Sequence, residues 1–373
     1  DAAALIRKLT STSIKSYGGL GGLKTVSSRG LGANHSKIVA DGFGINNTQN
    51  GQVNLGQIHS DNIIYIRSNS DGNSQFLNPI SAQVAGSQFS LETFENNFGN
   101  EGLQFRLLAK QGSFNQKGSY GAMKFSSEKF LFSGHGSFRS ADGNYPFTLI
   151  NGNQTSEANR SNNDYSDYHF GLTSGIKKGK SVIRLGYMQK EFDQGLPGAV
   201  ILYNNSADER ITSRDQNLFG DHVYKGKKTS LRSFIKINEN HMNYTDPNYL
   251  GQDGGINISY RNRSIQAGIA GENRLAENLK IHFGVEEVIS DLLVSDTTFA
   301  RPLRYHNYAI LGLKYKFSKK YKLSLQLSEQ FINEKNSAGT SAENKFKINP
   351  YIELSTEEEQ KFGHKVWYRN SFR

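Results

Sequence analysis

Apolar and polar residues alternate over long stretches of the chain from about residue 100 onward. In the clearest case, apolar residues occupy every second position of 311–317 and again of 321–327, and a polar Ser-Lys-Lys segment at 318–320 separates the two stretches. A helix would scatter these apolar side chains around its surface, whereas a strand places all of them on one face. The pattern therefore predicts two antiparallel strands joined by a turn.

The same alternation recurs along the chain and predicts thirteen strands. We expect them near residues 102–109, 117–126, 129–140, 164–177, 180–192, 211–224, 228–242, 254–273, 279–293, 304–317, 321–333, 344–354 and 362–373. The apolar residues of 256–260 and those of 265–269 stand at opposite parity, which predicts a β-bulge or a break near 261–264.

The connections between these strands alternate in length. Short ones near 127, 178, 226, 276 and 319, and a slightly longer one at 355–360, alternate with long polar ones at 141–163, 193–210, 243–253, 294–303 and 334–343. Short turns at one end and long loops at the other are typical of outer-membrane barrels, and the strand lengths suit a tilted membrane crossing. A soluble sandwich or propeller has no reason to keep this rhythm. The sequence therefore predicts a transmembrane β-barrel.

The first part of the chain has a different composition. Residues 1–95 are rich in Gly, Asn and Ser and contain only short apolar segments, and 373 residues are enough for two domains. We therefore expect one domain at 1–95 and a barrel domain at 96–373. Because single-chain bacterial barrels have an even number of strands, the odd count predicts that further strands follow residue 373.

Composition and charge exclude several other classes. The absence of cysteine excludes a disulfide scaffold and thiol chemistry, and no apolar run is long enough for a transmembrane helix. The formal net charge is +10, but Lys and Arg are spread evenly and form no basic arm. We interpret the excess as a solvated basic surface. A soluble nucleic-acid binder is the alternative from another class, and it predicts salt-sensitive DNA binding.

The chain contains no arrangement typical of catalysis or of a resident cofactor. We find no Ser-His-Asp order and no paired carboxylates in a recognisable setting, so we expect no enzyme, no cofactor and no metal site. His135, His282 or His364 could reach a haem iron if they faced a lumen, although wall histidines explain them more simply. The Asp-rich segment 162–167 could hold Ca²⁺, but it has no EF-hand pattern.

Four short segments near the N-terminus follow one another in a characteristic order. They are the glycine-rich turn at 18–22, Arg29-Gly30 after an apolar stretch, the apolar 37–40 running into Asp41-Gly42, and Asp61-Asn62-Ile63. Residues 13–66 in this way resemble the plug domain of TonB-dependent outer-membrane transporters. Segments 142–147, 193–198 and 368–373 are similar to segments common in such receptors from Bacteroidetes.

The resemblance implies an all-β transmembrane barrel of the type with about 22 strands, here partial, with an N-terminal α+β plug domain inside its lumen. The sequence departs from the family in three ways. It lacks the TonB box and the start of the plug, and Thr10-Ser11-Thr12 stands where the family has Pro-Gly. Several of the family's C-terminal strands are also missing.

The resemblance also implies a latch between plug and barrel. In the family the arginine matching Arg29 is expected to pair with acidic residues of the inner wall. Glu286 has the parity opposite to the apolar face of its strand and should face the lumen, and Glu287 would replace it if the register slipped. A buried pair of this kind would cost about 3–5 kcal/mol to break from one side.

Two further groups of residues are singled out. The plug turns lack the Lys-Ser/Thr of a phosphate-binding loop, so we interpret their residues as tight turns: Gly18, Gly19, Gly21, Gly22, Gly30, Asp41 and Gly42. Aromatic and polar residues of the first long loops are the expected ligand contacts: Tyr145, Phe147, Tyr165, Asp193 and Gln194.

Taken together, the resemblance implies a TonB-dependent transporter in the outer membrane that imports a large scarce nutrient, namely a ferric siderophore, a cobalamin or haem. Its expected partners are the TonB-ExbB-ExbD complex, outer-membrane lipid and lipopolysaccharide, a surface lipoprotein and a small-molecule ligand, with no nucleic acid. The alternative is a non-transporting barrel subunit that scaffolds an outer-membrane protein assembly.

Overall fold

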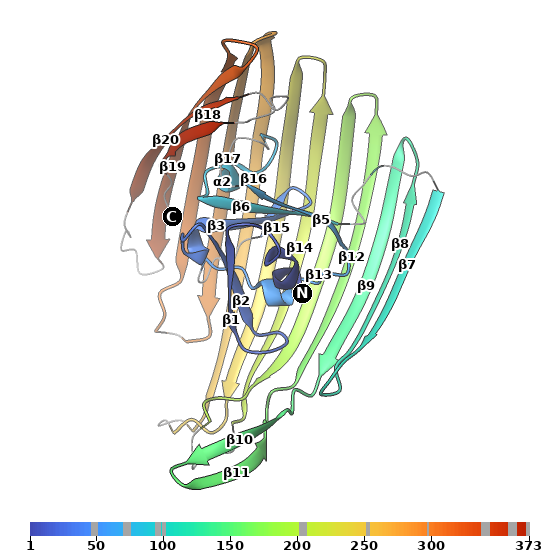
Figure 1. Ribbon diagram of the computed structural model, residues 1–373, viewed down its shortest axis with the longest axis vertical. Helices are drawn as coiled ribbons and strands as arrows, with labels where there is room; N and C mark the ends of the chain where they lie inside the picture. The colour runs from blue at the N-terminus through green and yellow to red at the C-terminus, as the bar shows by residue number, and fades with distance from the viewer. Residues whose placement is uncertain are drawn as a thin grey trace.

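The computed structural model describes residues 1–45, 51–69, 76–93, 98, 102–200, 207–250, 254–296, 298–336, 344–356 and 364–370. A large curved sheet forms one layer, and a small domain made from residues 1–93 lies against its inner face (Figure 1). We call this small domain the plug.

Within the described residues, the large sheet has thirteen antiparallel strands that lie side by side in chain order. This confirms the expected number of strands. The strands are β7 (Gly102–Gln111), β8 (Lys117–Ser126), β9 (Phe130–Ala141), β12 (Tyr165–Lys178), β13 (Ser181–Leu196), β14 (Glu209–Lys225), β15 (Thr229–Asp246), β16 (Ile256–Ala276), β17 (Leu279–Val294), β18 (Pro302–Lys316), β19 (Tyr321–Asn336), β20 (Lys345–Thr356) and β21 (Lys365–Arg369).

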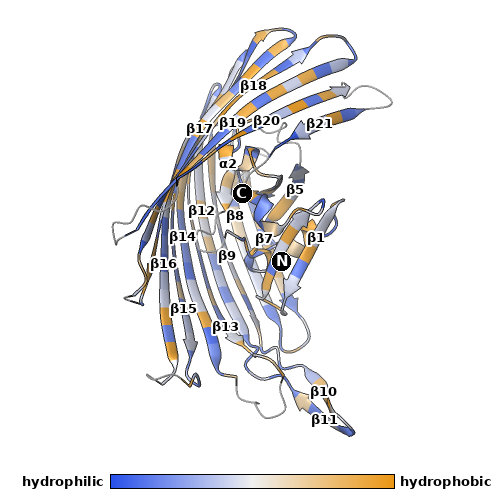
Figure 2. Cartoon of the chain, turned by 90° about the vertical axis from the view of Figure 1, so that its left-hand side faces the viewer, coloured by the Kyte–Doolittle hydropathy of each residue, from blue (hydrophilic) through white to orange (hydrophobic). Residues whose placement is uncertain are grey.

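The alternation in the sequence separates the two faces of this sheet, and Figure 2 shows it along the strands. On β19, Leu325 and Leu327 are 39% and 54% exposed on the outer face, whereas Gln326 and Ser328 between them are buried on the inner face. The polar face is thus covered and the apolar face is open. A water-soluble sheet does the reverse, and an apolar outer surface is what a membrane barrel presents to lipid.

The two ends of the sheet differ in their connections. The short turns 127–129, 179–180, 226–228, 277–278 and 317–320 lie at one end, which we call the turn end. The opposite end, the loop end, has the longer connections. Several of these are shorter than expected because the strands continue into them: β13 reaches Leu196 and β15 reaches Asp246.

The expected loop at 141–163 contains a hairpin that the alternation did not predict. It consists of β10 (Pro146–Asn151) and β11 (Gln154–Asn159), which pair with each other and extend beyond the loop end of the sheet (Figure 1). The two strands are short, and most of their polar residues are exposed. Their pattern therefore lacks the one-sided apolar face that identifies a strand of the sheet.

The prediction of a β-bulge or a break near 261–264 is wrong. β16 pairs without interruption from Ile256 to Arg274, and its register shifts only between Arg274 and Ala276. The apolar residues change face because β16 is 21 residues long and only part of it carries the apolar outer surface. Ile258 and Tyr260 therefore stand on the inner face near the loop end.

The plug is an α+β domain with its own core. Its elements are α1 (Ala2–Ile6), β1 (Thr12–Tyr17), β2 (Leu23–Ser28), η1 (Ala33–His35), β3 (Ser36–Ala40), β4 (Phe43–Ile45), η2 (Leu55–Gln57), β5 (Ile63–Asn69), α2 (Ile80–Gln83) and β6 (Ser87–Thr93). β1 and β2 form a hairpin, and four strands form a sheet in the order β4-β3-β6-β5 with β3 and β6 parallel. Ile6, Val26, Ile38, Leu55 and Phe89 form the buried core.

The expected domain boundary at residues 95 and 96 lies outside the described residues. Among the residues that the structure describes, no helix is long and apolar enough to cross a membrane.

Candidate functional site between the plug and the wall

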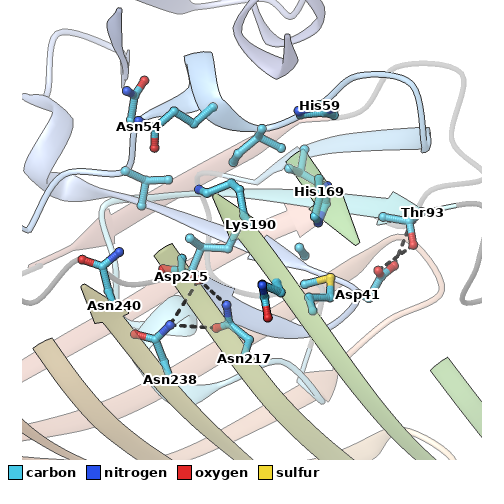
Figure 3. A pocket seen from close by; sticks show the side chains of 18 of the residues that line it. Asp41, Asn54, His59, Thr93, His169, Lys190, Asp215, Asn217, Asn238 and Asn240 are labelled. Atoms are coloured by element: carbon cyan, nitrogen blue, oxygen red, sulfur yellow. Dashed lines mark hydrogen bonds between the residues drawn. The ribbon is translucent and has the colours of Figure 1, made fainter. Parts of the chain in front are cut away.

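A cavity of about 200 Å³ lies between the plug and the inner face of β12–β16 and extends toward the loop end (Figure 3). Side chains of the plug and of the wall both line it. Amide side chains supply much of its polar surface: Gln52, Asn54, Gln57, Asn62, Gln189, Asn217, Asn238, Asn240 and Asn262. We call it the loop-side cavity.

The wall of this cavity is a network of amides around one carboxylate. Asn238 donates to Asp215 Oδ1 at 3.3 Å and to Asn217 Oδ1 at 3.0 Å, and Asn217 also donates to Asp215. Lys190 lies at the same cavity, and Lys236 donates to the carbonyl of Gly44 in the plug at 2.7 Å. Amides both donate and accept, so this surface suits a ligand with many hydrogen-bonding groups.

The plug is joined to β9 and β12 through His59. His59 Nε2 lies 2.9 Å from Asp167 Oδ2, and His59 Nδ1 lies 2.9 Å from Ser137 Oγ. Arg139 donates Nε to both carboxylate oxygens of Asp167 at 3.1 Å, and Tyr165 donates its hydroxyl to Oδ2 at 2.6 Å. All five residues are buried. We call this group the His59 contact.

The charges within the His59 contact are balanced. Asp167 is a buried carboxylate that Arg139 neutralises through several hydrogen bonds. Burial lowers the pKa of His59, the hydrogen bond to Asp167 opposes this shift, and the positive charge of Arg139 adds to it. The contact therefore favours a neutral histidine.

A second joint connects the plug to β13–β15 through Arg232. Its Nη1 donates to the carbonyl oxygens of Gly42 at 2.6 Å and Leu77 at 3.0 Å, and its Nε donates to Asp221 at 2.7 Å. Arg184 also donates to Asp221, at 2.9 and 2.5 Å. We call this group the Arg232 contact. Here a wall side chain binds the backbone of the plug.

The backbone of the Asp41-Gly42 turn makes this approach possible. The turn joins β3 to β4, and both residues have positive φ, 50° and 87°, as a two-residue type I′ hairpin requires. A Cβ at Gly42 would lie 2.9–3.1 Å from the Arg232 guanidinium group. Glycine is therefore needed both for the turn and for the contact.

A third joint involves the glutamate of the expected latch, but with another partner. Glu286 is buried on the inner face of β17, accepts the backbone N–H of Ser81 at 3.0 Å and accepts from Gln266 at 2.7 Å. The predicted pairing with Arg29 is not formed. Arg29 instead lies with its guanidinium carbon 5.7 Å from the ring centroid of Trp367 in β21. We call this the Glu286 contact.

The reason for this difference is the position of Arg29 in the plug. Arg29 and Gly30 form a turn after β2, with φ values of 52° and 77°, and this turn faces β21, whereas Glu286 lies on β17. Glu287 is exposed on the outer face, so the expected alternative register does not occur. Parity correctly placed Glu286, but it carried no information about which plug residue would lie opposite.

The glycines at 18–22 form a tight turn between β1 and β2. Gly18 and Gly21 have positive φ, 115° and 74°. A Cβ at Gly22 would lie 2.9–3.0 Å from backbone atoms of Gly18, and a Cβ at Gly21 would overlap the ring of Tyr165 in the His59 contact. Gly19 has open space around its Cβ position. The turn thus packs directly against the wall.

Two of the expected ligand residues lie far from the cavity in the β10–β11 hairpin region. Tyr145 is 40% exposed and makes an edge-on ring contact with Phe114 at 6.0 Å. Phe147 is half-buried in β10. Neither lines the loop-side cavity. Their role in ligand binding stays a prediction.

The other three expected ligand residues belong to the wall. Tyr165 is 2% exposed and its hydroxyl is used within the His59 contact, so it is not a loop residue open to ligand. Asp193 pairs with Arg210, and Gln194 is half-buried in the β12–β13 ladder. The strands continue farther toward the loop end than the alternation indicated, which brings these positions into the sheet.

The histidine and Ca²⁺ alternatives can be placed in the same way. His135 and His282 face inward and are buried, and His282 bonds Gln326 at 3.1 Å, whereas His364 is exposed beside β21. In segment 162–167, Asp164 pairs with Arg210 at 2.5 Å. Within the described parts of the chain, no group of three or more His, Asp or Glu side chains is arranged to hold a metal ion.

Sequence reasoning missed His59 and Arg232, and it considered Asp167 only as part of the Asp-rich segment 162–167. The parity of β12 and β15 places Asp167 and Arg232 on the inner face, so their burial as charged residues could have been noticed. His59 stands two residues before the Asp61-Asn62-Ile63 segment of the plug pattern. No signal in the sequence connects it with Asp167, which lies 108 positions away.

Comparison with known proteins agrees with this architecture. Residues 1–82 match the family model of the TonB-dependent Receptor Plug Domain. No curated protein matches the sequence.

Solved structures match over nearly the whole chain. They include the FrpB iron transporter from Neisseria meningitidis (TM-score 0.76, 12% identity, 99% of this chain and 61% of that one). The ferric yersiniabactin uptake receptor FyuA from Yersinia pestis matches with a TM-score of 0.66 and 12% identity over 99% of this chain and 61% of its own. The alcaligin receptor FauA from Bordetella pertussis matches with a TM-score of 0.70 and 10% identity over 99% of this chain and 59% of its own.

The described fold, a small plug domain beside a sheet of thirteen strands, is thus similar to the plug and part of the barrel of these solved outer-membrane proteins. The chain spans about three fifths of the length of the receptors named above. At such low identity the likeness concerns the fold alone.

Proposed function

We propose that this chain is part of a TonB-dependent outer-membrane transporter that imports a large scarce nutrient: a ferric siderophore, a cobalamin or haem. In this proposal residues 1–95 are the plug and 96–373 part of the barrel, which further strands close in the membrane. The loop end faces the outside of the cell, and the apolar outer face contacts lipid and lipopolysaccharide. TonB-ExbB-ExbD supplies the energy, and no step involves catalysis by the chain.

The observation that supports this proposal best is the loop-side cavity. Because both the plug and the wall line it, a ligand bound there would contact both at once. Such a ligand changes the free energy of their association, which is the coupling that an energised transporter needs between binding and plug movement. A scaffold subunit has no need of a ligand cavity at this interface.

The lining suggests the chemistry of the cargo. Many amides favour a ligand with hydroxyl, amide or carboxylate groups, and Lys190 and Lys236 would assist an anionic group. The net charge of +10 would also attract anions toward the protein over long distances. Siderophore chelates and the propionates of haem carry such groups.

The test is uptake by the source cells. The probes are a radiolabelled panel of ferric siderophores, cobalamin and haem. Cells that lack this gene should lose uptake of one of them. Cells that lack TonB should show the same loss. If uptake of every probe is unchanged and an outer-membrane protein assembly disappears instead, the transporter proposal is wrong and the scaffold alternative replaces it.

A pair of variants connects this test to the cavity. Asn238→Leu removes hydrogen-bonding groups from the cavity and should weaken binding of the transported probe. Asn243→Leu, on the same strand but on the opposite face of the sheet, is the matched control and should leave binding unchanged. Equal losses in both variants would show that the cavity is not the binding site.

A further inference from the structure

A second cavity lies on the other side of the plug sheet. It has a volume of about 520 Å³ and is lined by wall residues near the turn end, among them Arg184, Lys225, Ser230 and Glu272. We call it the turn-side cavity. Both cavities follow the same part of the wall, β13–β15, one toward each end of the sheet.

Only a thin layer of plug separates the two cavities. Asp41, Leu91 and Thr93 line both of them. Asp41 accepts the backbone N–H of Thr93 at 2.9 Å with one carboxylate oxygen and its hydroxyl at 2.7 Å with the other, as Figure 3 shows. Its own backbone N–H donates to the carbonyl of Leu91 at 2.9 Å. Asp41 thus ties the ends of β3 and β6 together at the point where the cavities meet.

We propose that the Asp41–Thr93 junction is a gate, and that its opening joins the loop-side and turn-side cavities into a passage along β13–β15. The proposal rests on the transport function proposed above and identifies the route and the residues that close it. In the closed state described here, the two hydrogen bonds to Thr93 hold the gate shut.

The surroundings of Asp41 provide a second arrangement for its carboxylate. Asp41 is half-buried at the tip of the β3–β4 hairpin, one residue before Gly42. Arg232, which binds the next residue of the turn, has a buried Nη2 without a hydrogen-bond partner among the described residues. A carboxylate released from Thr93 therefore has a cationic donor close by.

The opposite ends of the same two strands are built differently. Ser36 and Ser87 face each other across β3 and β6 with their hydroxyl oxygens 2.8 Å apart, and both are buried. Neither lines either cavity. This pair holds the same strands together away from the proposed gate, and it provides a matched control.

The first experiment measures potassium chloride conductance across planar bilayers with the purified protein as its cells make it. Asp41→Ala should produce current steps that the wild type lacks, because the two cavities become connected. Thr93→Val is a second variant, which serves as the test if Asp41→Ala does not fold. It removes only the hydroxyl hydrogen bond to Asp41 and should therefore produce smaller current steps. Asp296→Ala is the control. Asp296 lies in a loop and accepts the backbone N–H and the hydroxyl of Thr298, much as Asp41 does from Thr93, so its loss should produce no current steps.

The second experiment locks the gate. The sequence has no cysteine, so an introduced pair of cysteines has no other thiol of the chain to react with. An Asp41→Cys/Thr93→Cys disulfide should abolish uptake of the transported probe, and a reductant should restore uptake. A Ser36→Cys/Ser87→Cys disulfide should leave uptake unchanged. Equal loss of uptake with both disulfides would overturn the proposal, because it would mean that β3 and β6 must separate along their whole length.

The two proposals fail in distinguishable ways. If the wild type takes up no probe but Asp41→Ala conducts and Asp296→Ala does not, the gate stands and the transport function falls. If the wild type transports while neither Asp41→Ala nor Thr93→Val conducts and the Asp41–Thr93 disulfide still permits uptake, the gate is wrong and transport stands.

Discussion

The plug is held to the wall in two contrasting ways. At β9 and β12, the plug side chain His59 enters a group of wall side chains centred on Asp167. At β15, the wall side chains Arg232 and Lys236 reach backbone carbonyls of the plug. Cavities lie along the second wall on both sides of the plug sheet.

This difference shows which contacts between plug and wall depend on the identity of the plug residue. The His59 contact needs a particular side chain in the plug, because only that side chain completes the group around Asp167. The Arg232 contact uses plug carbonyls, which every residue has, and its one demand on side-chain identity is the glycine at position 42 that leaves room for the guanidinium group. We infer that the first wall anchors the plug and that the second is the side on which it is remodelled.

The largest effect is expected at the His59 contact, which we infer to be the anchor of the plug. Asp167→Asn removes the buried negative charge that Arg139 and His59 share and should lower the free energy of plug opening by about 3–5 kcal/mol. Asp164→Asn, in an exposed pair with Arg210, should change it by less than about 1 kcal/mol. Hydrogen exchange of plug amides in both variants measures this free energy. Similar values for the two would contradict the assignment of the anchor.

The next effect tests the backbone contact. Gly42→Ala would place a Cβ against the Arg232 guanidinium group, and overpacking of this kind costs about 1–3 kcal/mol. Gly30→Ala is the matched control, because Gly30 also has a positive φ but open space around its Cβ position. Gly42→Ala should therefore be the more destabilising of the two in thermal unfolding. Equal shifts in Tm would show that the backbone conformation alone accounts for the loss.

An effect of similar size is expected at the Glu286 contact. Glu286→Ala removes a buried acceptor from the Ser81 N–H and from Gln266, which should cost about 1–3 kcal/mol. Glu287→Ala changes an exposed side chain on the outer face and should cost less than about 0.5 kcal/mol. Thermal unfolding of the two neighbours tests the register of β17. The opposite ranking would mean that the register is shifted by one residue.

The smallest effect is a pH dependence of the anchor. Burial lowers the pKa of His59 in the folded plug, so the unfolded chain binds its proton at a higher pH than the folded one. Stability from this residue is complete above its unfolded pKa of about 6.5 and is lost as the pH falls toward the lower folded value. Hydrogen exchange near His59 should accordingly show weaker protection at about pH 5 than at about pH 7. His59→Gln should flatten this difference, and an unchanged slope would assign the titration to another group.

Much of the sheet could be predicted from local pattern. In β19 the alternation of Leu325 and Leu327 with Gln326 and Ser328 determines the strand, its faces and its approximate length, because the side-chain period of a strand is two. The same rule placed Glu286 inward. It failed at the β10–β11 hairpin, where neither face is buried and no alternation is required.

The sequence by itself therefore determined the thirteen strands, the inward and outward faces and the tight turns of the plug, since each depends on residues close together in the chain. Only the tertiary structure decided that Glu286 meets Ser81 and not Arg29, that His59 meets Asp167, and that two cavities share Asp41 and Thr93. These contacts join segments that are far apart in sequence. Parity gives the face on which a side chain lies, but the position of the plug along the wall decides what lies opposite.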